Sequence, residues 1–211
     1  MGGGRAGRVL VVSITLFFVH RCFENEVRVC VWVGYLTNYV YVASSLDGFI
    51  ATKDGGLDWL TEIPNSEKSD YGYAEFSSGI DAIVMGRNTF EKVLTFDFWP
   101  YEKPVFVLSK SLDSVPENLV GKVEIVNGDL RQLVEALKDR GFQNLYIDGG
   151  RVIQSFLAED LIDEMIISWI PILLGDGVPL FGKLKDSLKF SHKKTESYKA
   201  LVQSHYTRIR D

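Results

Sequence analysis

Short apolar runs alternate with amphipathic stretches along most of the chain, a pattern that predicts strands alternating with helices. The clearest helix is expected from Asp129 to Arg140, because apolar residues recur there at helical spacing, at Leu130, Leu133, Val134 and Leu137. Asp129 is expected to cap its first turn, and Gly141 to end it. Shorter helices are expected over 66–78, where Gly72 weakens the pattern, over 88–93 and over 152–157.

Compact apolar runs bounded by Gly, Pro or Asp predict buried strands, at 40–43, 82–85, 105–108, 123–126, 145–147 and 165–170. Two longer runs, 190–198 and 201–209, predict a closing hairpin that turns at Lys199-Ala200. Strands that alternate with helices imply an α/β fold of three αβα layers, in which a mostly parallel sheet is covered on both faces. The hairpin adds an antiparallel edge to this sheet.

Residues 44–59 form a long connection rich in Gly, Asp and Ser, with a turn signal at Asp54-Gly55-Gly56. A connection of this length inside a compact domain is usually functional. We therefore expect it to lie over a site.

Residues 1–37 have a different character from the rest of the chain. Arg5 and Arg8 precede an apolar run, Val9–Val19, as in a signal peptide, but no clean cleavage site follows. The run is too short for a membrane-spanning helix, which makes a membrane tether the less favoured interpretation. The favoured hypothesis is sequence upstream of the true start, with Leu36 read as an alternative initiator, and a buried strand is the other alternative. An intact mass of the native protein that includes residues 1–35 would exclude the start-site hypothesis. The domain itself is expected over 38–211.

Composition excludes some classes of protein. The chain of 211 residues is 46% hydrophobic and carries a net charge of −5. That charge argues against a nucleic-acid-binding protein, which usually has a basic stripe, but it leaves room for a local basic pocket. The two cysteines, Cys22 and Cys30, lack a usual metal-ligand spacing, and the zinc-deaminase signature is absent. We expect no metal site and no membrane association, and a cytoplasmic protein without disulfides.

Two strand-to-helix junctions carry the candidate chemistry, since both the G-x-G-x-x-G fingerprint and the P-loop are missing. In the first, Gly86 permits a sharp turn, and Arg87 and Thr89 bring a cation and a hydroxyl to a helix start, which already favours anions. In the second, Gly149-Gly150 would allow a ligand to approach the backbone closely. Either junction alone is more simply a tight turn with a solvated arginine, but both together favour a phosphate-bearing ligand.

These junctions belong to longer motifs. V-M-G-R-N-T-F (84–90), P-V-F-V-L-S-K-S (104–111) and L-Y-I-D-G-G-R-V-I (145–153) occur in an order that resembles the dihydrofolate reductase superfamily. S-S-L-D-G-F-I-A (44–51) and I-P-I-L-L-G-D-G-V-P-L-F (170–181) resemble more narrowly the reductase domain of the bifunctional riboflavin-biosynthesis deaminase-reductase and its stand-alone bacterial relatives. The resemblance covers about 38–210. It implies a dihydrofolate-reductase-like fold and NADPH as the cofactor.

The resemblance also implies which residues bind the cofactor. Gly86 to Thr89 would hold the pyrophosphate and adenosine, and Ser109 and Lys110 would approach the 2′-phosphate. Gly149 to Val152 would line the pyrophosphate and nicotinamide. The full set is Ala43, Ile50, Gly86, Arg87, Asn88, Thr89, Leu108, Ser109, Lys110, Asp148, Gly149, Gly150, Arg151 and Val152. Cations at Arg87 and Lys110 suit the extra phosphate of NADPH, whereas an NAD site favours an acid at the ribose.

In a reductase of this kind the cofactor carries the hydride, and the protein orients it and supplies a proton. Folate reductases use a carboxylate on the first helix, and Asp70 lies at a similar spacing, sixteen positions before Gly86. A solvated helix residue is the alternative for Asp70. Asp47 is a second candidate, with a turn-forming role as its alternative. Trp59 resembles the loop tryptophan of folate reductases, or it anchors the loop in the core.

The leading hypothesis is an NADPH-dependent reductase acting on a pyrimidine- or pterin-like small molecule. The resemblance favours 5-amino-6-(5-phosphoribosylamino)uracil, whose ribosylamino group would be reduced to a ribitylamino chain. Dihydrofolate reductase activity is one alternative, and a non-catalytic NADPH-binding protein of the same fold is another. Relatives are often dimers, so a homodimer is expected, with residues 165–170 and the terminal hairpin as the predicted interface.

Overall fold

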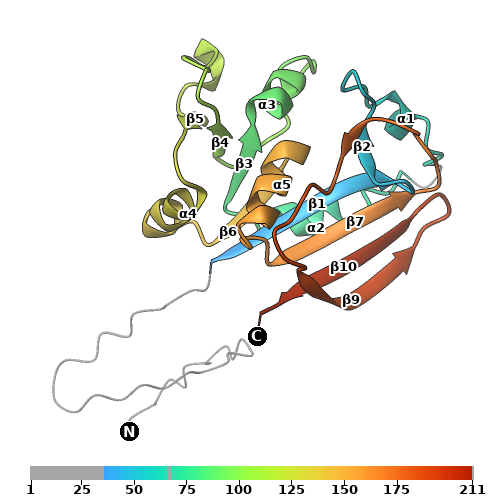
Figure 1. Cartoon of the computed structure of the whole chain (residues 1–211). Helices are drawn as coiled ribbons and strands as arrows, with labels where there is room; N and C mark the ends of the chain where they lie inside the picture. Colours follow the sequence, from blue (N-terminus) through green and yellow to red (C-terminus); the bar gives the residue numbers. More distant parts are fainter. Residues whose placement is uncertain (1–35, 66–67, 211) are drawn as a thin grey trace, which may run out of the picture. The chain divides into compact units, whose positions relative to one another are not determined.

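A computed structural model describes residues 36–65 and 68–210 of the chain (Figure 1). The expectations about the apolar run Val9–Val19 and about Cys22 and Cys30 concern residues outside this part. Eight strands of the described residues form one sheet in the order β5-β4-β3-β6-β1-β7-β10-β9. Their bounds are β1 Thr37–Ser45, β3 Ala82–Gly86, β4 Val105–Leu108, β5 Val123–Val126, β6 Asn144–Asp148, β7 Glu164–Ile170, β9 Lys189–Ser197 and β10 Val202–Ile209.

The pairing within this sheet is parallel from β5 to β7 and antiparallel for β7-β10 and β10-β9. The mostly parallel sheet with a terminal antiparallel hairpin is therefore confirmed. β3 is buried on both faces from Ala82 to Met85, which explains why its sequence is a continuous apolar run rather than an alternating one. The hairpin turns where predicted, because Tyr198 N donates to Leu201 O.

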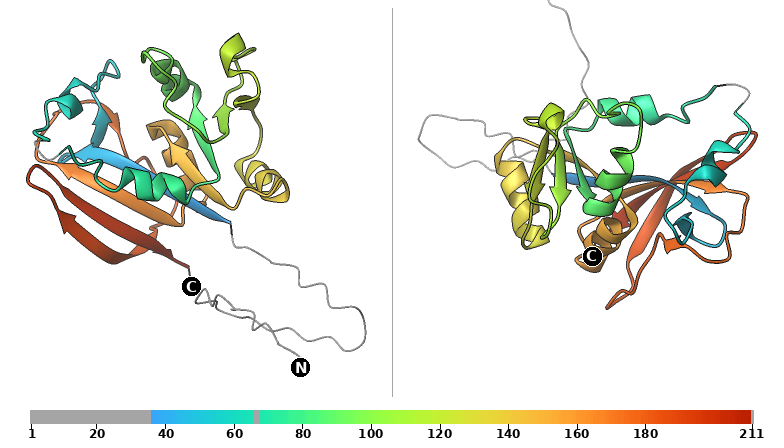
Figure 2. Two further views of the ribbon diagram at one scale, coloured as in Figure 1. Left: turned by 180° about the vertical axis from the view of Figure 1, so that it is seen from behind. Right: turned by 90° about the horizontal axis from the view of Figure 1, so that it is seen from above.

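Helices cover both faces of the sheet, as the two views of Figure 2 show. α4 (Leu130–Asp139) and α5 (Gly150–Ala158) pack on the face that carries Val40, Val84 and Ile147. α2 (Tyr73–Ser78) and α3 (Arg87–Val93) pack on the opposite face, around Met85 and Tyr146. A short helix α1 (Asp58–Thr61) and a 3₁₀ turn, η1 (Glu117–Leu119), complete the helical elements. The three-layer αβα architecture is thus confirmed.

The helix α4 begins as the sequence predicts. The carboxylate of Asp129 accepts a hydrogen bond from Gln132 N at 3.0 Å, which satisfies an amide that the first turn leaves unpaired. At the other end, Gly141 has a φ of 92°, a conformation that glycine adopts without strain.

The helix predicted over 66–78 is shorter than expected, and this prediction is wrong at its start. Tyr71 and Gly72 have φ values of 54° and 86°, so the backbone is left-handed there and cannot continue a right-handed helix. Gly72 is the residue before the first turn, and α2 begins only at Tyr73.

Residues 44–59 also differ from the predicted loop. β1 continues to Ser45, and β2 (Phe49–Ala51) pairs antiparallel with β8 (Val178–Pro179) in a second, two-stranded sheet. At the other end, β1 begins at Thr37, and Leu36 packs against the core. The described part of the fold therefore includes Leu36 and Thr37, the last two residues of the predicted extension.

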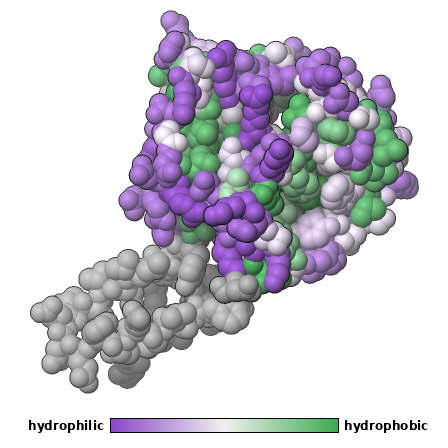
Figure 3. All heavy atoms as spheres, viewed as in Figure 1, coloured by the Kyte–Doolittle hydropathy of each residue, from purple (hydrophilic) through white to green (hydrophobic). Residues whose placement is uncertain are grey.

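The surface is mostly polar, but apolar side chains gather near the end of the molecule that carries α1 and the C-terminal end of β7 (Figure 3). Leu46, which follows β1, is 57% exposed, and Leu173, which follows β7, is 70% exposed. The homodimer expected from the sequence stays a prediction, and this end adjoins its predicted interface. No helix in the described ranges has the length and apolar character needed to cross a membrane.

Candidate functional site

Three parallel strands end side by side and bring the two candidate junctions together. Gly86 at the end of β3 is in register with Leu108 at the end of β4. On the other side of β3, Met85 is in register with Asp148 of β6. Ligands of open α/β sheets bind beyond the carboxyl ends of the strands, which makes this edge the candidate site.

Close packing joins the residues that the sequence assigned to the cofactor. A Cβ atom on Gly150 would lie 2.9 Å from Ile50 Cδ1, and one on Gly86 would lie 3.0 Å from Val152 Cγ2. Protein atoms fill the space where a side chain of Gly149 or Gly150 would be, and the close approach of a ligand to this backbone stays a prediction. Gly149 is required by its packing against Thr89 of the other junction, and Gly150 by its packing against Ile50 and the strand β8.

The start of α5 offers backbone donors at this edge. Gly149 precedes the helix without a side-chain cap, and the first intrahelical bond of this turn runs from Ile153 N to Gly149 O. The amides of Gly150, Arg151 and Val152 therefore have no acceptor within the helix. Such an end favours a phosphate or another anion.

Arg87 reaches from the start of α3 toward the turn that follows β4. Its Nε lies 2.6 Å from Glu91 Oε1, and its Nη1 donates to Ser111 Oγ at 2.9 Å. Ser109 Oγ accepts from the amides of Ser111 and Leu112 at 3.2 and 3.0 Å, which shapes this turn. Arg87 and the Ser109-Lys110 turn are thus brought together, as a 2′-phosphate site requires.

The remaining predicted cofactor residues divide by exposure. Asn88, Lys110 and Arg151 are exposed at the strand-end edge, and Ile50 and Leu108 are half-buried. Ala43, near the end of β1, packs beside the cluster around Trp59.

Asp148 has an environment that the sequence analysis missed. Along β6, Leu145 and Ile147 belong to the core under α5, whereas Tyr146 and Asp148 alternate onto the opposite face. Burial raises the pKa of the Asp148 carboxyl to about 6, although hydrogen bonds from Gly149 N and from the hydroxyls of Tyr146 and Tyr101 lower it. The alternation of side chains along β6 could have revealed this environment from the sequence, because it places Asp148 on the same face as Tyr146.

Aromatic rings surround this carboxyl group. Tyr101 Oη lies 3.5 Å from Asp148 Oδ2, and the Tyr101 ring meets Trp99 edge-on at 5.3 Å between centroids. Trp99 in turn packs edge-on against Phe90 of α3. Burial, and then the nearby charge of Asp148, raise the pKa of Tyr101 well above its ordinary value. Its hydroxyl therefore stays protonated and can donate to Asp148.

Asp70 is placed differently from the prediction, because it precedes α2 instead of lying on it. Its carboxylate accepts from Ala74 N at 2.9 Å and Gly72 N at 3.1 Å, and these bonds lower its pKa. The side chain is also exposed. An exposed carboxylate that is held ionised in this way caps a helix, and it is a poor source of a proton at neutral pH.

Asp47 and Trp59 also occupy structural positions. Asp47 accepts from Ser45 Oγ at 2.6 Å and from the amides of Leu174 and Gly175 at 3.1 and 2.7 Å, and these bonds lower its pKa. This carboxylate joins the turn after β1 to the segment after β7. Trp59 is 7% exposed and packs in a core cluster, which matches the anchoring role given as its alternative. The described residues contain no group of three acidic, His or Cys side chains arranged for a metal ion.

Comparison with known proteins decides the family. The RibD C-terminal domain model matches residues 39–203. The chain belongs to this family. A crystal structure of a putative riboflavin biosynthesis protein from Shewanella sp. PV-4 is 51% identical, covers 83% of this chain and 100% of its own, and has a TM-score of 0.80. The uncharacterized protein YwjB of Bacillus subtilis is 39% identical over 80% of this chain and 96% of its own length.

Two further comparisons are more distant. The riboflavin biosynthesis protein RibD of Aquifex aeolicus is 27% identical over 74% of this chain, which spans 53% of that protein. Dihydrofolate reductase from Enterococcus faecalis, solved with NADP(H), is 20% identical over 82% of this chain and 97% of its own, with a TM-score of 0.59. This likeness confirms the dihydrofolate-reductase-like fold, and the chain is a relative of RibD.

Proposed function

We propose that this protein is an NADPH-dependent reductase of a pyrimidine- or pterin-like small molecule, with Asp148 as its proton donor. The observation that carries the proposal is a half-buried carboxyl with a pKa of about 6, placed next to the glycine junction at the sheet edge. A general acid works best when its pKa lies near the working pH, and among the described residues the Asp148 carboxyl meets that condition.

The strand-end edge fits NADPH by its own chemistry. The free amides at the start of α5 suit a pyrophosphate. Arg87 lies against the Ser109-Lys110 turn, where a guanidinium and an ammonium would meet the 2′-phosphate that distinguishes NADPH from NADH. When bound, NADPH would supply the hydride.

The residues of this chain would then supply the proton. Reduction of a C=N or C=O bond adds a hydride to carbon and a proton to the heteroatom, while NADPH becomes NADP⁺. Asp148 would release that proton and be left as a carboxylate, which Tyr101 stabilises by donating its hydroxyl proton. Solvent would protonate Asp148 again before the next turnover.

The riboflavin intermediate 5-amino-6-(5-phosphoribosylamino)uracil is the favoured substrate within this class. Its support is the 51% identity to a putative riboflavin biosynthesis protein, together with the relationship to RibD. Dihydrofolate is the alternative, supported only by a shared fold at 20% identity.

The test has two stages. Titration with NADPH and NADH, followed by tryptophan fluorescence, should show NADPH bound more tightly, and no NADPH binding would overturn the proposal. Oxidation of NADPH is then measured with each substrate, in wild type and in Asp148→Asn. The matched control is Asp129→Asn, which makes the same chemical change at the cap of α4. Loss of turnover in Asp148→Asn alone supports the proposal, whereas NADPH binding without turnover of either substrate supports the non-catalytic alternative.

A further inference from the structure

The buried side-chain amide of Gln203, on β10, donates a hydrogen bond to the backbone of Tyr71, just before α2. Gln203 Nε2 lies 3.1 Å from Tyr71 O, 3.1 Å from Tyr41 Oη and 3.0 Å from Ser168 Oγ. Tyr41 Oη also donates to Tyr71 O, at 2.7 Å. Gln203 and Ser168 are each 6% exposed. One backbone carbonyl therefore receives donors from two strands of the sheet, β1 and β10.

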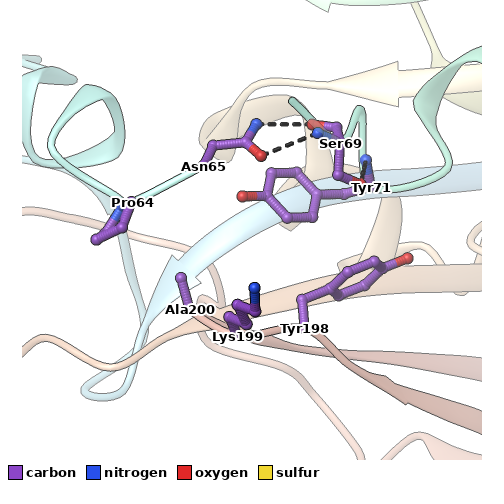
Figure 4. A pocket seen from close by; sticks show the side chains of 7 residues that line it. All are labelled: Pro64, Asn65, Ser69, Tyr71, Tyr198, Lys199 and Ala200. Carbon is purple, nitrogen blue, oxygen red and sulfur yellow. Dashed lines mark hydrogen bonds between the residues drawn. The ribbon is translucent and has the colours of Figure 1, made fainter. Parts of the chain in front are cut away.

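The segment held in this way has a conformation that needs support. Tyr71 has a φ of 54°, in the left-handed region that a bulky residue rarely adopts, and Gly72 follows with 86°. Additional bonds fix the segment from its other side: Ser69 Oγ accepts from Tyr71 N at 3.0 Å, and the side-chain amide of Asn65 brackets the backbone of Ser69 (Figure 4). The Tyr71 ring packs edge-on against Tyr198 at 5.0 Å. Backbone strain that is held from several sides is typical of functional regions.

The strained segment leads directly into α2, whose aromatic side chains pack on the same face of the sheet as Tyr146. Tyr73, the first residue of α2, meets the ring of Tyr41 edge-on at 5.6 Å, and Phe76 stacks on it at 4.7 Å. Tyr73 is close enough to Asp148 for that carboxylate to contribute to raising its pKa, after burial. On the other side, Tyr146 Oη donates to the backbone of Tyr41 at 2.9 Å. The bonds to Tyr71 O therefore hold the backbone two residues before Tyr73, at the start of α2.

We propose that Gln203 is a positioning residue of the reductase site, and that its amide holds Tyr71 O so that α2 lies over Asp148. The catalytic part of this inference rests on the proposed function. Gln203 lies outside every sequence motif that points to the cofactor. It contacts the hydroxyl of Tyr41, whereas Tyr146, beside Asp148, contacts the backbone of Tyr41. Burial raises the pKa of Tyr41 to about 12, so its hydroxyl remains the second donor to the same carbonyl throughout the physiological pH range.

The neighbouring residue on β10 provides a matched control. Ser204 is also 6% exposed, but its side chain lies on the other face of the sheet, where its Oγ is 3.0 Å from Thr195 Oγ1. Gln203→Met removes both amide donors while keeping a similar volume, and Ser204→Ala removes a buried polar group without touching the Tyr71 carbonyl. A general loss of packing would affect both variants alike.

The experiment compares these two variants by three readouts: NADPH affinity, the pKa of Asp148 from carboxyl carbon NMR, and steady-state kinetics. Gln203→Met should move the pKa of Asp148 toward its ordinary value and lower kcat by up to about a hundredfold, the cost of a misplacement of about 1 Å, with NADPH affinity kept. Ser204→Ala should leave all three unchanged. Equal effects of the two variants, or an unchanged Asp148 pKa in Gln203→Met, would overturn the inference.

A second variant keeps the test decisive where Gln203→Met does not fold. Tyr41→Phe keeps the ring but removes one donor to Tyr71 O, and it should shift the pKa of Asp148 in the same direction by less. An unchanged pKa of Asp148 in Tyr41→Phe would contradict the proposal that the bonds to Tyr71 O position α2. The NMR readout needs neither cofactor nor substrate, so a wild-type protein that fails to bind NADPH would overturn the proposed function while the role of Gln203 is still decided.

Discussion

Gly149 and Thr89 fit together so closely that a Cβ atom on Gly149 would overlap the hydroxyl oxygen of Thr89. Gly149 also has a φ of 91°, which a residue with a side chain adopts only under strain. Gly149→Ala should therefore lower the free energy of unfolding by about 1–3 kcal/mol, measured by denaturant titration. Adding Thr89→Ala should relieve the overlap and recover part of that loss. No recovery in the double variant would show that the backbone conformation alone is responsible.

The raised pKa of Asp148 predicts a gain of stability when the acid is removed. Its folded pKa of about 6 lies above the ordinary value of 3.8, so the unfolded chain releases this proton at lower pH than the folded one. Folding is therefore favoured by the protonated acid below about pH 4, and this contribution is lost as the pH rises to about 6. Asp148→Asn should exceed wild type in stability by about 3 kcal/mol at pH 7. The difference should shrink at pH 4, and thermal unfolding at both pH values measures it.

The pH profile of turnover separates the two candidate proton donors. If Asp148 is the acid, kcat/KM of the wild type falls as the pH rises above about 6, because the protonated form is required. Asp148→Asn should lose turnover with NADPH affinity kept. Asp70→Asn should keep the wild-type profile, because the carboxyl is exposed and an asparagine oxygen can still accept one of the two amide bonds of the cap. The reverse result would return the proton donor to Asp70, as spacing alone suggested.

Asp70 also shows why sequence reasoning places a cofactor edge better than a catalytic acid. The cofactor residues follow strand ends, and hydrophobic runs reveal strands without any knowledge of the tertiary fold. β3, β4 and β6 agree with their predicted runs to within one residue at either end, and their ends do meet. The protonation of a carboxyl depends instead on what is packed around it, and Tyr73, Tyr101 and Tyr146 come from three separate segments.

The start of α2 illustrates a second limit. The composition of 66–78 is compatible with a helix, and only the backbone conformation at Tyr71 and Gly72 shows that it begins at Tyr73. That conformation is held by Gln203, which lies 132 positions away along the chain. A propensity argument over a short window cannot contain such a contact.

Cofactor preference is predicted to depend on Arg87. Its guanidinium lies beside Ser111 in the turn that also carries Ser109 and Lys110, so it is placed to meet a 2′-phosphate. Arg87→Ala should weaken the binding of NADPH by about tenfold or more, the usual cost of losing a hydrogen bond to a charged group. The binding of NADH should change much less. Fluorescence titration with both cofactors measures the two changes. Equal losses for NADPH and NADH would show that Arg87 does not meet the additional phosphate.

Glu91 is predicted to oppose the binding of that phosphate, because its carboxylate already pairs with Arg87 at 2.6 Å. A 2′-phosphate would have to compete for the same guanidinium and would lie near a like charge. Glu91→Gln should therefore tighten NADPH by roughly 2–5-fold, in the range of an exposed ion pair, and leave NADH unchanged. The matched control is Glu159→Gln, which removes the same charge from another exposed pair, with Arg131, at the opposite end of α5 from Gly150. Weaker NADPH binding in Glu91→Gln would show instead that Glu91 orients Arg87 for the phosphate, and an equal gain in both variants would reduce the effect to net charge.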